Sequence, residues 1–291
     1  MDLRAILMGL AFALMWSSAF TSARIIVTNA PPLAVSSLRF FIAGIVTLVI
    51  ARALGQSFRL TRQQWRLTIV FGICQNALYL GLNFVAMQTV EASIAAIIAS
   101  SLPLWVGLAG WLIWGERVGM LGVCGLIGGF VGVALIMGTR LTSGLDALGV
   151  VFCVLGVLAL TFATLAVRGA SSGGNMLTVV GYQMFIGAIA LAVPAQFEVW
   201  DFNWSPVLIV AIAYTIFVPG VIATIVWFWL VNRIGTVRAA TFHFLNPFLG
   251  VAIAAVLLGE TLGFLDLIGV AIITLSILAV QMSKTKAMTR I

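Results

Sequence analysis

The stretch "AAIIASSLPLWVGLAGWLIWGERVG" (Ala95 to Gly119) occurs a second time, in altered letters, as "AATFHFLNPFLGVAIAAVLLGETLG" (Ala239 to Gly263). Both versions place a proline, Pro103 or Pro247, twelve residues before a Gly-Glu-x-x-Gly motif. The two prolines are separated by 144 residues, and so are the two motifs. Two long apolar segments that share a proline and a motif at the same spacing, one fixed distance apart, indicate an internal duplication.

The same offset aligns landmarks along the whole chain, and no gap is needed between residues 2 and 280. The aligned pairs are Asp2 with Asp146, Arg24 with Arg168, Glu116 with Glu260 and Gly125 with Gly269. We therefore predict two domains, a first repeat over residues 1–141 and a second repeat over residues 142–291.

The composition places this chain in lipid. It is 63% hydrophobic and 8% charged, whereas a soluble domain carries about 25% charged residues. Inside a bilayer the backbone must satisfy its own hydrogen bonds, which leaves helices or closed barrels. The apolar runs are about 20 residues long without alternating polarity, so they predict helices and an all-α integral membrane protein.

Ten apolar runs are separated by charged or turn-rich breaks, five in each repeat. The predicted spans are 4–24, 32–53, 65–87, 92–114, 119–138, 147–168, 175–197, 207–231, 237–258 and 263–282. Two consecutive copies with an odd number of spans must cross the bilayer in opposite directions. Inverted repeats around a binding site at the membrane midplane are typical of secondary transporters.

Lysine and arginine are distributed unevenly between the two predicted membrane faces. Twelve lie on one side, namely Arg4, Arg52, Arg59, Arg62, Arg66, Arg117, Arg168, Arg233, Arg238, Lys284, Lys286 and Arg290, against Arg24 and Arg140 on the other. Because positive residues concentrate on the cytoplasmic side, both termini should be cytoplasmic. The first span could be read as a signal peptide, but its repeat counterpart lies in mid-chain, which argues that it is retained.

The remaining residue patterns exclude several function classes. The cysteines (Cys74, Cys124 and Cys153) lie inside apolar runs without metal-binding spacing, so no metal site or disulfide framework is expected. No phosphate loop, zinc-protease motif or nucleophile elbow occurs, so we expect no cofactor and no enzyme activity. The net charge of +7 comes from loop residues, so a nucleic-acid partner is not expected either.

Four segments resemble the drug/metabolite transporter superfamily, and each half resembles one EamA-type domain. They are "LMWSSAF" (Leu14 to Phe20), "SLRFFIAG" (Ser37 to Gly44) and the two proline-containing stretches quoted above. The resemblance implies a central cavity, with spans five and ten outside it, in a bacterial-type inner (plasma) membrane. The superfamily includes exporters of amino acids and other metabolites, drug exporters and nucleotide-sugar carriers, and the branch that exports aromatic amino acids is the most similar.

Span three carries the clearest polar stripe, because Asn76, Tyr79 and Asn83 are spaced as one face of a helix. Such residues either line a cavity or bond neighbouring helices together. The equivalent residues of span eight are Gly220, Ala223 and Trp227. If both faces line one cavity, it is amide-bearing on one side and apolar on the other, which suits a substrate with a polar head and an apolar body.

Spans one, four and nine supply further candidates for substrate binding. Trp16 and Phe20 lie one turn apart in span one, where ordinary packing is the alternative, and Ser100 lies in span four. His243 is the only histidine, with Asn246 one turn away. This histidine can carry a coupling proton, contact the substrate or serve a structural role, and these alternatives remain open.

Proline and glycine mark the predicted hinges. Pro103 and Pro247 each remove a backbone donor in mid-span, and Pro219 with Gly220 should kink span eight. Each bend would let a repeat act as a gate in alternating access. The carbonyl groups freed one turn earlier are a second candidate for substrate contact.

Arg39 is the one charge away from the ends of the predicted spans, roughly 10 Å from the outer end of span two by the helical rise. It could hold a substrate carboxylate, pair with Glu91 or extend toward the lipid headgroups. Two repeated carboxylates, Glu116 and Glu260, should cap the helix that follows each of them. Span five carries the glycine face Gly125, Gly128, Gly129 and Gly132, for tight helix packing or for a homodimer in place of a monomer.

Charge narrows the substrate class. Nucleotide sugars call for lysine or arginine at mid-depth, and cationic drugs call for a carboxylate there. Neither occurs, because Arg39 is shallow. We therefore expect a transporter that exports neutral or zwitterionic metabolites, amino acids with aromatic or large apolar side chains above all. The alternatives are other small amphipathic metabolites or drugs and a nucleotide-sugar-type carrier, and both proton antiport and facilitated diffusion remain open.

Overall fold

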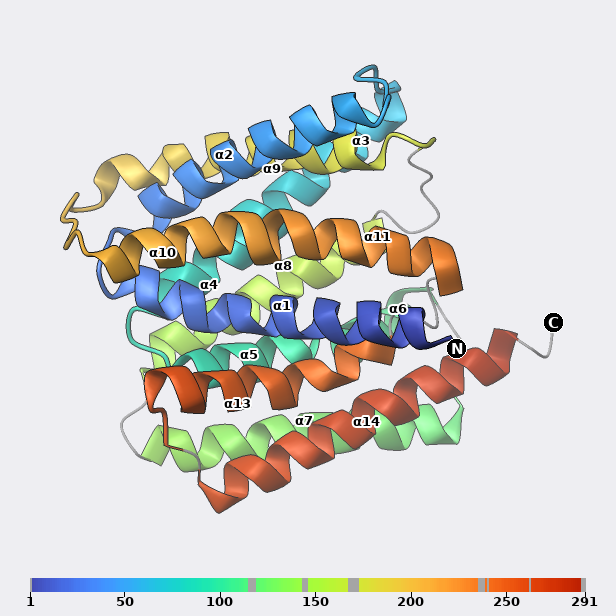
Figure 1. The fold of residues 1–291 in the computed structure, drawn as a ribbon. Helices are drawn as coiled ribbons and strands as arrows, with labels where there is room; N and C mark the ends of the chain where they lie inside the picture. Colours follow the sequence, from blue (N-terminus) through green and yellow to red (C-terminus); the bar gives the residue numbers. More distant parts are fainter. Residues whose placement is uncertain are drawn as a thin grey trace. The chain divides into compact units, whose positions relative to one another are not determined.

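The computed structural model describes residues 2–114, 119–142, 146–166, 173–234, 239, 241–261 and 263–288 (Figure 1). The described residues form helices and connecting turns, without a strand. The helices of the first half are α1 (Leu3–Val27), α2 (Pro32–Ala53), α3 (Arg62–Phe71), the π-helix η1 (Gly72–Leu80), α4 (Gly81–Ala86), α5 (Ala92–Ser100), α6 (Leu102–Trp114) and α7 (Met120–Thr142). Those of the second half are α8 (Ala147–Ala166), α9 (Met176–Ala192), η2 (Pro194–Phe197), α10 (Pro206–Thr215), the π-helix η3 (Ile216–Ile222), α11 (Ala223–Ile234), η4 (Thr241–Leu245), α13 (Asn246–Leu258) and α14 (Phe264–Met288).

The apolar helices agree with the predicted spans. In the described part of the chain, seven helical segments are long and apolar enough to cross a bilayer, and three shorter apolar helices correspond to spans five, nine and ten. Large apolar side chains such as Phe197 (88% exposed) and Val256 (82%) lie on the surface, as expected where lipid replaces water. The predicted all-α membrane fold is confirmed. Of the basic residues used for orientation, Arg117, Arg168, Arg238 and Arg290 lie outside the described residues.

The chain forms two compact units, and each contains segments of both predicted repeats. Unit 1 comprises Met1–Thr21, Thr89–Val150 and Val226–Ile291, and unit 2 comprises Ser22–Gln88 and Val151–Ile225. Compactness in space therefore does not follow the order of the duplication along the chain.

In unit 1 the repeat-equivalent helices α7 and α14 pack side by side (Figure 1). A Cβ atom added at Gly125 would lie 2.7 Å from the carbonyl oxygen of Ser276, and one added at Gly132 would lie 3.1 Å from that of Gly269. Under the 144-residue offset Gly125 is equivalent to Gly269, and Gly132 is equivalent to Ser276. The two contacts are therefore equivalent to each other. Because one residue number rises as its partner's number falls, the helices are antiparallel. The glycine face of span five is thus buried inside unit 1, which is the packing use predicted for it.

Unit 2 repeats this arrangement with α2 and α9, which also lie side by side (Figure 1). A Cβ atom at Gly44 would lie 3.2 Å from the carbonyl oxygen of Gly181. The equivalent contact is a hydrogen bond of 2.8 Å that the Ser37 hydroxyl donates to the carbonyl of Ala188. Small residues permit such close approach between apolar helices. Antiparallel packing of equivalent helices is what an inverted duplication requires.

The expected role of Glu260 is wrong in one respect. Its carboxylate does not cap the following helix, since it accepts hydrogen bonds from the backbone N–H groups of Ala92 (2.8 Å) and Ser93 (3.0 Å) at the start of α5. The unsatisfied N–H groups and positive dipole end of α5 attract a carboxylate from any part of the chain that reaches them. The local cap of α14 is instead Asp266, which accepts from the N–H of Gly263 at 2.8 Å. Glu116 lies outside the described residues.

Two further long-range caps occur in unit 2, at the starts of α2 and α9. The Glu198 carboxylate accepts from the N–H groups of Leu33 (2.9 Å) and Ala34 (2.9 Å), and Oε1 of Gln56 accepts from those of Leu177 (2.9 Å) and Thr178 (3.2 Å). The capped pairs are equivalent under the 144-residue offset. In both cases a residue of one repeat completes a helix of the other repeat.

Replacing Glu260 with glutamine should lower the thermal unfolding midpoint, because α5 loses a charged acceptor at its positive end. We expect a loss of about 1 kcal/mol, measured by thermal unfolding in detergent. Asp201→Asn is the matched control, since Asp201 is an exposed carboxylate outside the helices, and it should leave the midpoint unchanged. Equal effects of the two substitutions would contradict the assigned cap.

Candidate substrate-binding site

Four rings meet in unit 1, contributed by α1, α11 and η4. The ring of Phe12 lies 4.7 Å from that of Trp227 and 5.1 Å from the imidazole of His243. The imidazole is also 5.0 Å from Trp227 and 6.3 Å from Trp16, in edge-on arrangements. The sequence analysis selected Trp16, Trp227 and His243 as candidates, and the structure brings all three together.

Local sequence explains how this aromatic cluster is positioned. Phe12 and Trp16 lie one turn apart and so project from the same side of α1. His243 belongs to the short 3₁₀ helix η4, which leads directly into α13. Pro247 occupies the first turn of α13. Backbone N–H groups in a first turn have no partner within the helix, so the missing N–H of proline removes no hydrogen bond there. The break predicted near this proline is therefore present as a change from 3₁₀ to α geometry.

A chain of polar groups borders the aromatic cluster. The amide nitrogen of Asn246 lies 2.9 Å from Nδ1 of His243, and the hydroxyl of Ser17 donates to Oδ1 of Asn246 at 3.3 Å. With the Asn246 amide so oriented, Nδ1 accepts, and a neutral imidazole carries its proton on Nε2. The site thus combines an N–H donor with three aromatic rings, which suits a ligand with a polar oxygen and an apolar body.

Sequence reasoning missed Phe12 and gave Ser17 no role. The sequence could have indicated Phe12, because it lies four residues before Trp16, just as Trp16 lies four residues before Phe20. Phe20 itself is 9% exposed but makes no ring contact with the described aromatic residues. Ser100 is half-buried, and its hydroxyl bonds back to the carbonyl of Ala96 at 2.7 Å, within its own helix.

The polar stripe predicted in span three lies in unit 2. Asn76, Tyr79 and Asn83 are all less than 5% exposed. Asn76 donates to the carbonyl of Gln183 on α9 (3.0 Å), and Asn83 donates to the carbonyl of Tyr79 (2.8 Å). The Asn76 bond joins two helices, as the alternative predicted, whereas the Asn83 bond is local, to the residue one turn earlier. A cavity-lining role for these residues remains a prediction.

Both repeats contain a π-helix at the same place. η1 begins at Gly72 and η3 at Ile216, which are 144 residues apart. Pro219 lies inside η3, whereas η1 contains no proline, so proline alone does not cause this geometry. The kink expected at Pro219 and Gly220 takes the form of a wide turn, and such turns are frequent at functional sites.

The helix break predicted at Pro103 is present, because α5 ends at Ser100 and α6 begins at Leu102. Ser101 occupies the junction, where its N–H bonds to the carbonyl of Ile98 at 3.1 Å. The break thus lies just before the proline. A gating role for this break, and for those at Pro219, Gly220 and Pro247, stays a prediction.

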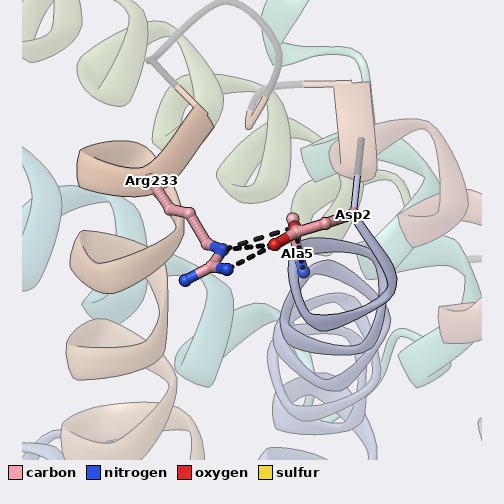
Figure 2. Close-up of polar contacts among 3 residues, drawn as sticks. All are labelled: Asp2, Ala5 and Arg233. Carbon is pink, nitrogen blue, oxygen red and sulfur yellow. Dashed lines mark hydrogen bonds and ion pairs between the residues drawn. The ribbon is translucent and has the colours of Figure 1, made fainter.

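An ion pair joins the start of α1 to the end of α11. Arg233 Nε donates to Asp2 Oδ2 at 3.0 Å, and Asp2 Oδ1 also accepts from the N–H of Ala5 at 3.1 Å (Figure 2). The repeat-equivalent contact is not an ion pair, since the Thr89 hydroxyl donates to the carboxylate of Asp146 at 2.7 Å. The bond from Arg233, and then that from Ala5, lowers the pKa of Asp2 from 3.8 to about 2.

The Asp2–Arg233 pair should respond to pH and salt. Because the folded pKa lies below the unfolded value, its stabilisation is present above about pH 4 and is lost as pH falls toward 2. Both side chains are nearly half exposed, so salt should weaken the pair. A double-mutant cycle of Asp2→Asn and Arg233→Gln, followed by thermal unfolding, should show coupling at low salt and neutral pH only. Coupling unaffected by salt would contradict this assignment.

Two repeats whose described equivalent helices run antiparallel, with breaks inside their spans, have the architecture of a membrane transporter. The chain belongs to the EamA-like transporter family, whose model matches residues 3–138 and 147–282. Each match covers one copy of the duplication.

Two relatives are named as transporters. The chain is 25% identical over 282 residues to "Uncharacterized transporter YvbV" of Bacillus subtilis (strain 168), covering 96% of this chain and 92% of the relative. It is 24% identical over 288 residues to "Uncharacterized inner membrane transporter YedA" of Escherichia coli (strain K12), covering 96% and 91%. A solved crystal structure of a protein aligns with a TM-score of 0.67 at 20% identity, over 100% of this chain and 99% of that chain, which supports the fold alone.

Proposed function

We propose that this transporter exports small neutral or zwitterionic metabolites by alternating access, and that amino acids with aromatic or large apolar side chains are its main substrates. The observation that carries the proposal is the aromatic cluster of unit 1 with its polar border. The rings of Phe12, Trp16 and Trp227 lie together, and an aromatic surface of this kind would pack against an apolar side chain. His243 and Asn246 supply hydrogen-bonding groups beside these rings.

The placement of carboxylates supports a substrate without a permanent positive charge. Among the described helices, Asp266 is the buried carboxylate (3% exposed), and it lies in the first turn of α14, bonded to the N–H of Gly263. It acts as a helix cap and so does not serve as a counter-ion at mid-depth. A site for cationic drugs would be expected to hold such a counter-ion.

Positive residues support an orientation with both termini in the cytoplasm of an inner-membrane protein. In this orientation the ion pair of Asp2 and Arg233, whose charges balance, lies on the cytoplasmic side, and the Thr89–Asp146 contact, which keeps the negative charge of Asp146, lies on the outer side. Gates at the two faces would then differ in charge. A monomer would suffice for this mechanism, and a homodimer is compatible with it.

Counterflow in proteoliposomes tests the proposed substrate class. Vesicles are loaded with one unlabelled compound, and uptake of labelled phenylalanine is followed. Exchange should occur with aromatic and large apolar amino acids, and not with nucleotide sugars or organic cations. Exchange by none of the amino acids would refute the substrate class and favour other amphipathic metabolites, which the same assay can screen.

Coupling is tested by comparing uptake with and without a pH gradient across the vesicle membrane. Proton antiport would run through His243, the one histidine of the chain. Uptake that is insensitive to the gradient would indicate facilitated diffusion instead. A gradient effect that disappears in His243→Gln would identify the histidine as the coupling group.

A further inference from the structure

Arg39 is a buried cation whose hydrogen-bonding groups are not fully used. The side chain is 6% exposed, so it does not extend to the lipid headgroups. Its Nε and Nη2 atoms have no hydrogen-bond partner among the described residues. Removing a charge from water without a partner is strongly unfavourable, so this arrangement calls for an explanation.

The two unpartnered nitrogen atoms of Arg39 share one edge of the guanidinium group. Nε and Nη2 lie along the same side of the planar guanidinium group, and their N–H bonds point in the same direction. This edge matches the two oxygens of a carboxylate, which accept one bond from each nitrogen. The hydroxyl of Ser36, one turn earlier on α2 and fully buried, also lacks a partner among the described residues.

Aromatic rings hold the guanidinium in place. Its central carbon lies 4.1 Å from the ring centroid of Phe40 and 4.4 Å from that of Phe84 on α4. Contact with ring faces partly stabilises a cation without using the N–H donors on the edge of the guanidinium plane, which are buried and, among the described residues, unbonded. The arrangement therefore orients Arg39 without using its hydrogen-bond donors.

The carboxylates of unit 2 do not pair with Arg39. Its acidic residues are Glu198 and Asp201. The carboxylate of Glu198 is bonded to the N–H groups of Leu33 and Ala34, and Asp201 is exposed in a loop. Glu91, the partner considered from the sequence, belongs to unit 1.

The duplication shows where space for a ligand arises. Asn76 and Gln183, which are bonded across η1 and α9, are equivalent to Gly220 and Arg39, and η3 also packs against α2. In the first interface the Asn76 side chain fills the gap, since a Cβ atom at Gly187 would lie 2.3 Å from it. Gly220 carries no side chain at the equivalent position. Among the described residues, a Cβ atom there meets only the carbonyl oxygen of Thr215, in its own helix, within 4 Å.

We propose that Arg39, with Ser36 beside it and Gly220 leaving room, binds the carboxylate of the transported solute between α2 and η3. This inference rests on the proposed function and narrows it to substrates with a free carboxylate. It also accounts for a charge in the first repeat that the second repeat replaces with Gln183.

The test uses counterflow with matched analogues. In the wild type, unlabelled phenylalanine should exchange for labelled phenylalanine, whereas phenylalaninamide, which lacks the carboxylate, should exchange about tenfold less or worse. Arg39→Gln should slow exchange of phenylalanine to the level of the amide, and Arg39→Lys should restore part of it. Arg52→Gln, which removes an exposed charge from the same helix, should behave as wild type. Undiminished discrimination in Arg39→Gln would overturn the proposal.

Stability supplies a second readout. Because an unpaired buried charge is unfavourable, Arg39→Met should raise the unfolding midpoint of the ligand-free protein, and a lower midpoint would indicate a paired structural role and overturn the proposal. Gly220→Val retains Arg39 but fills the space beside it. This variant should lose the discrimination between phenylalanine and its amide while remaining folded, and full retention would count against the site.

Failure of the proposed function can be distinguished from failure of this site. If the wild type exchanges no amino acid, the substrate class is refuted, and sodium benzoate then serves as the probe of Arg39. Benzoate should raise the unfolding midpoint of the wild type and of Arg52→Gln, but not that of Arg39→Gln. Equal shifts in the three proteins would overturn the carboxylate site.

Discussion

Leucine in place of Gly125 is expected to destabilise unit 1 strongly. The first side-chain atom at this position would already lie 2.7 Å from the backbone oxygen of Ser276 and 3.0 Å from Ala279 on α14. A backbone carbonyl cannot move aside as a side chain does, so α7 and α14 must separate. Overpacking a well-packed contact typically costs about 1–3 kcal/mol, more where backbone must shift, against a total stability of roughly 5–15 kcal/mol.

The measurement is the yield of monodisperse protein in detergent together with its thermal midpoint. Cys124→Leu is the matched control, because the neighbouring Cys124 is exposed, and it should be neutral. Gly269→Leu should reproduce the loss seen at Gly125, since its first side-chain atom would lie 2.4 Å from Ile136. A normal midpoint for Gly125→Leu would show that the two helices are not in close contact.

Alanine in place of Trp227 is expected to cause the largest loss of transport among single changes in the aromatic cluster. This ring contacts both Phe12 and His243, so its removal takes away one wall and frees the imidazole to move. We expect the transport efficiency for labelled phenylalanine to fall roughly tenfold or more, mainly through a higher KM. Initial rates of counterflow across a range of substrate concentrations provide the measurement.

Trp229→Ala is the matched control for this prediction. It removes the same side chain from the same helix, but Trp229 is 60% exposed, and transport should be retained. A normal midpoint together with unchanged KM in Trp227→Ala would remove the aromatic cluster from the substrate path. Comparable losses in both variants would point to a general effect of altering α11.

The sequence predicted the fold well because the bilayer restricts the alternatives. Span length, polarity and the 144-residue offset sufficed to place every apolar helix in the described chain. Trp16, Trp227 and His243 were each selected from the sequence, as one of a pair spaced one turn apart, as the repeat equivalent of Asn83 and as the only histidine. Their meeting in one cluster was not predicted, because it depends on contacts between three helices.

Other features could not be predicted because they depend on contacts between distant residues. The Glu260 carboxylate lies 168 and 167 residues from the amides it caps, and no local signal links them. The π-helix η1 contains no proline from which it could have been predicted. The bonds of Asn76 and Asn83 to backbone carbonyls likewise required coordinates, because spacing alone does not separate a lining residue from a bonding one.

The exchanged helix caps have a consequence for synthesis of the chain. The N–H groups at the start of α2 depend on Glu198, and those at the start of α5 depend on Glu260. A nascent chain that has inserted only its first five spans therefore holds two helix ends that nothing has yet completed. Its native state becomes attainable only when the last part of the polypeptide leaves the ribosome.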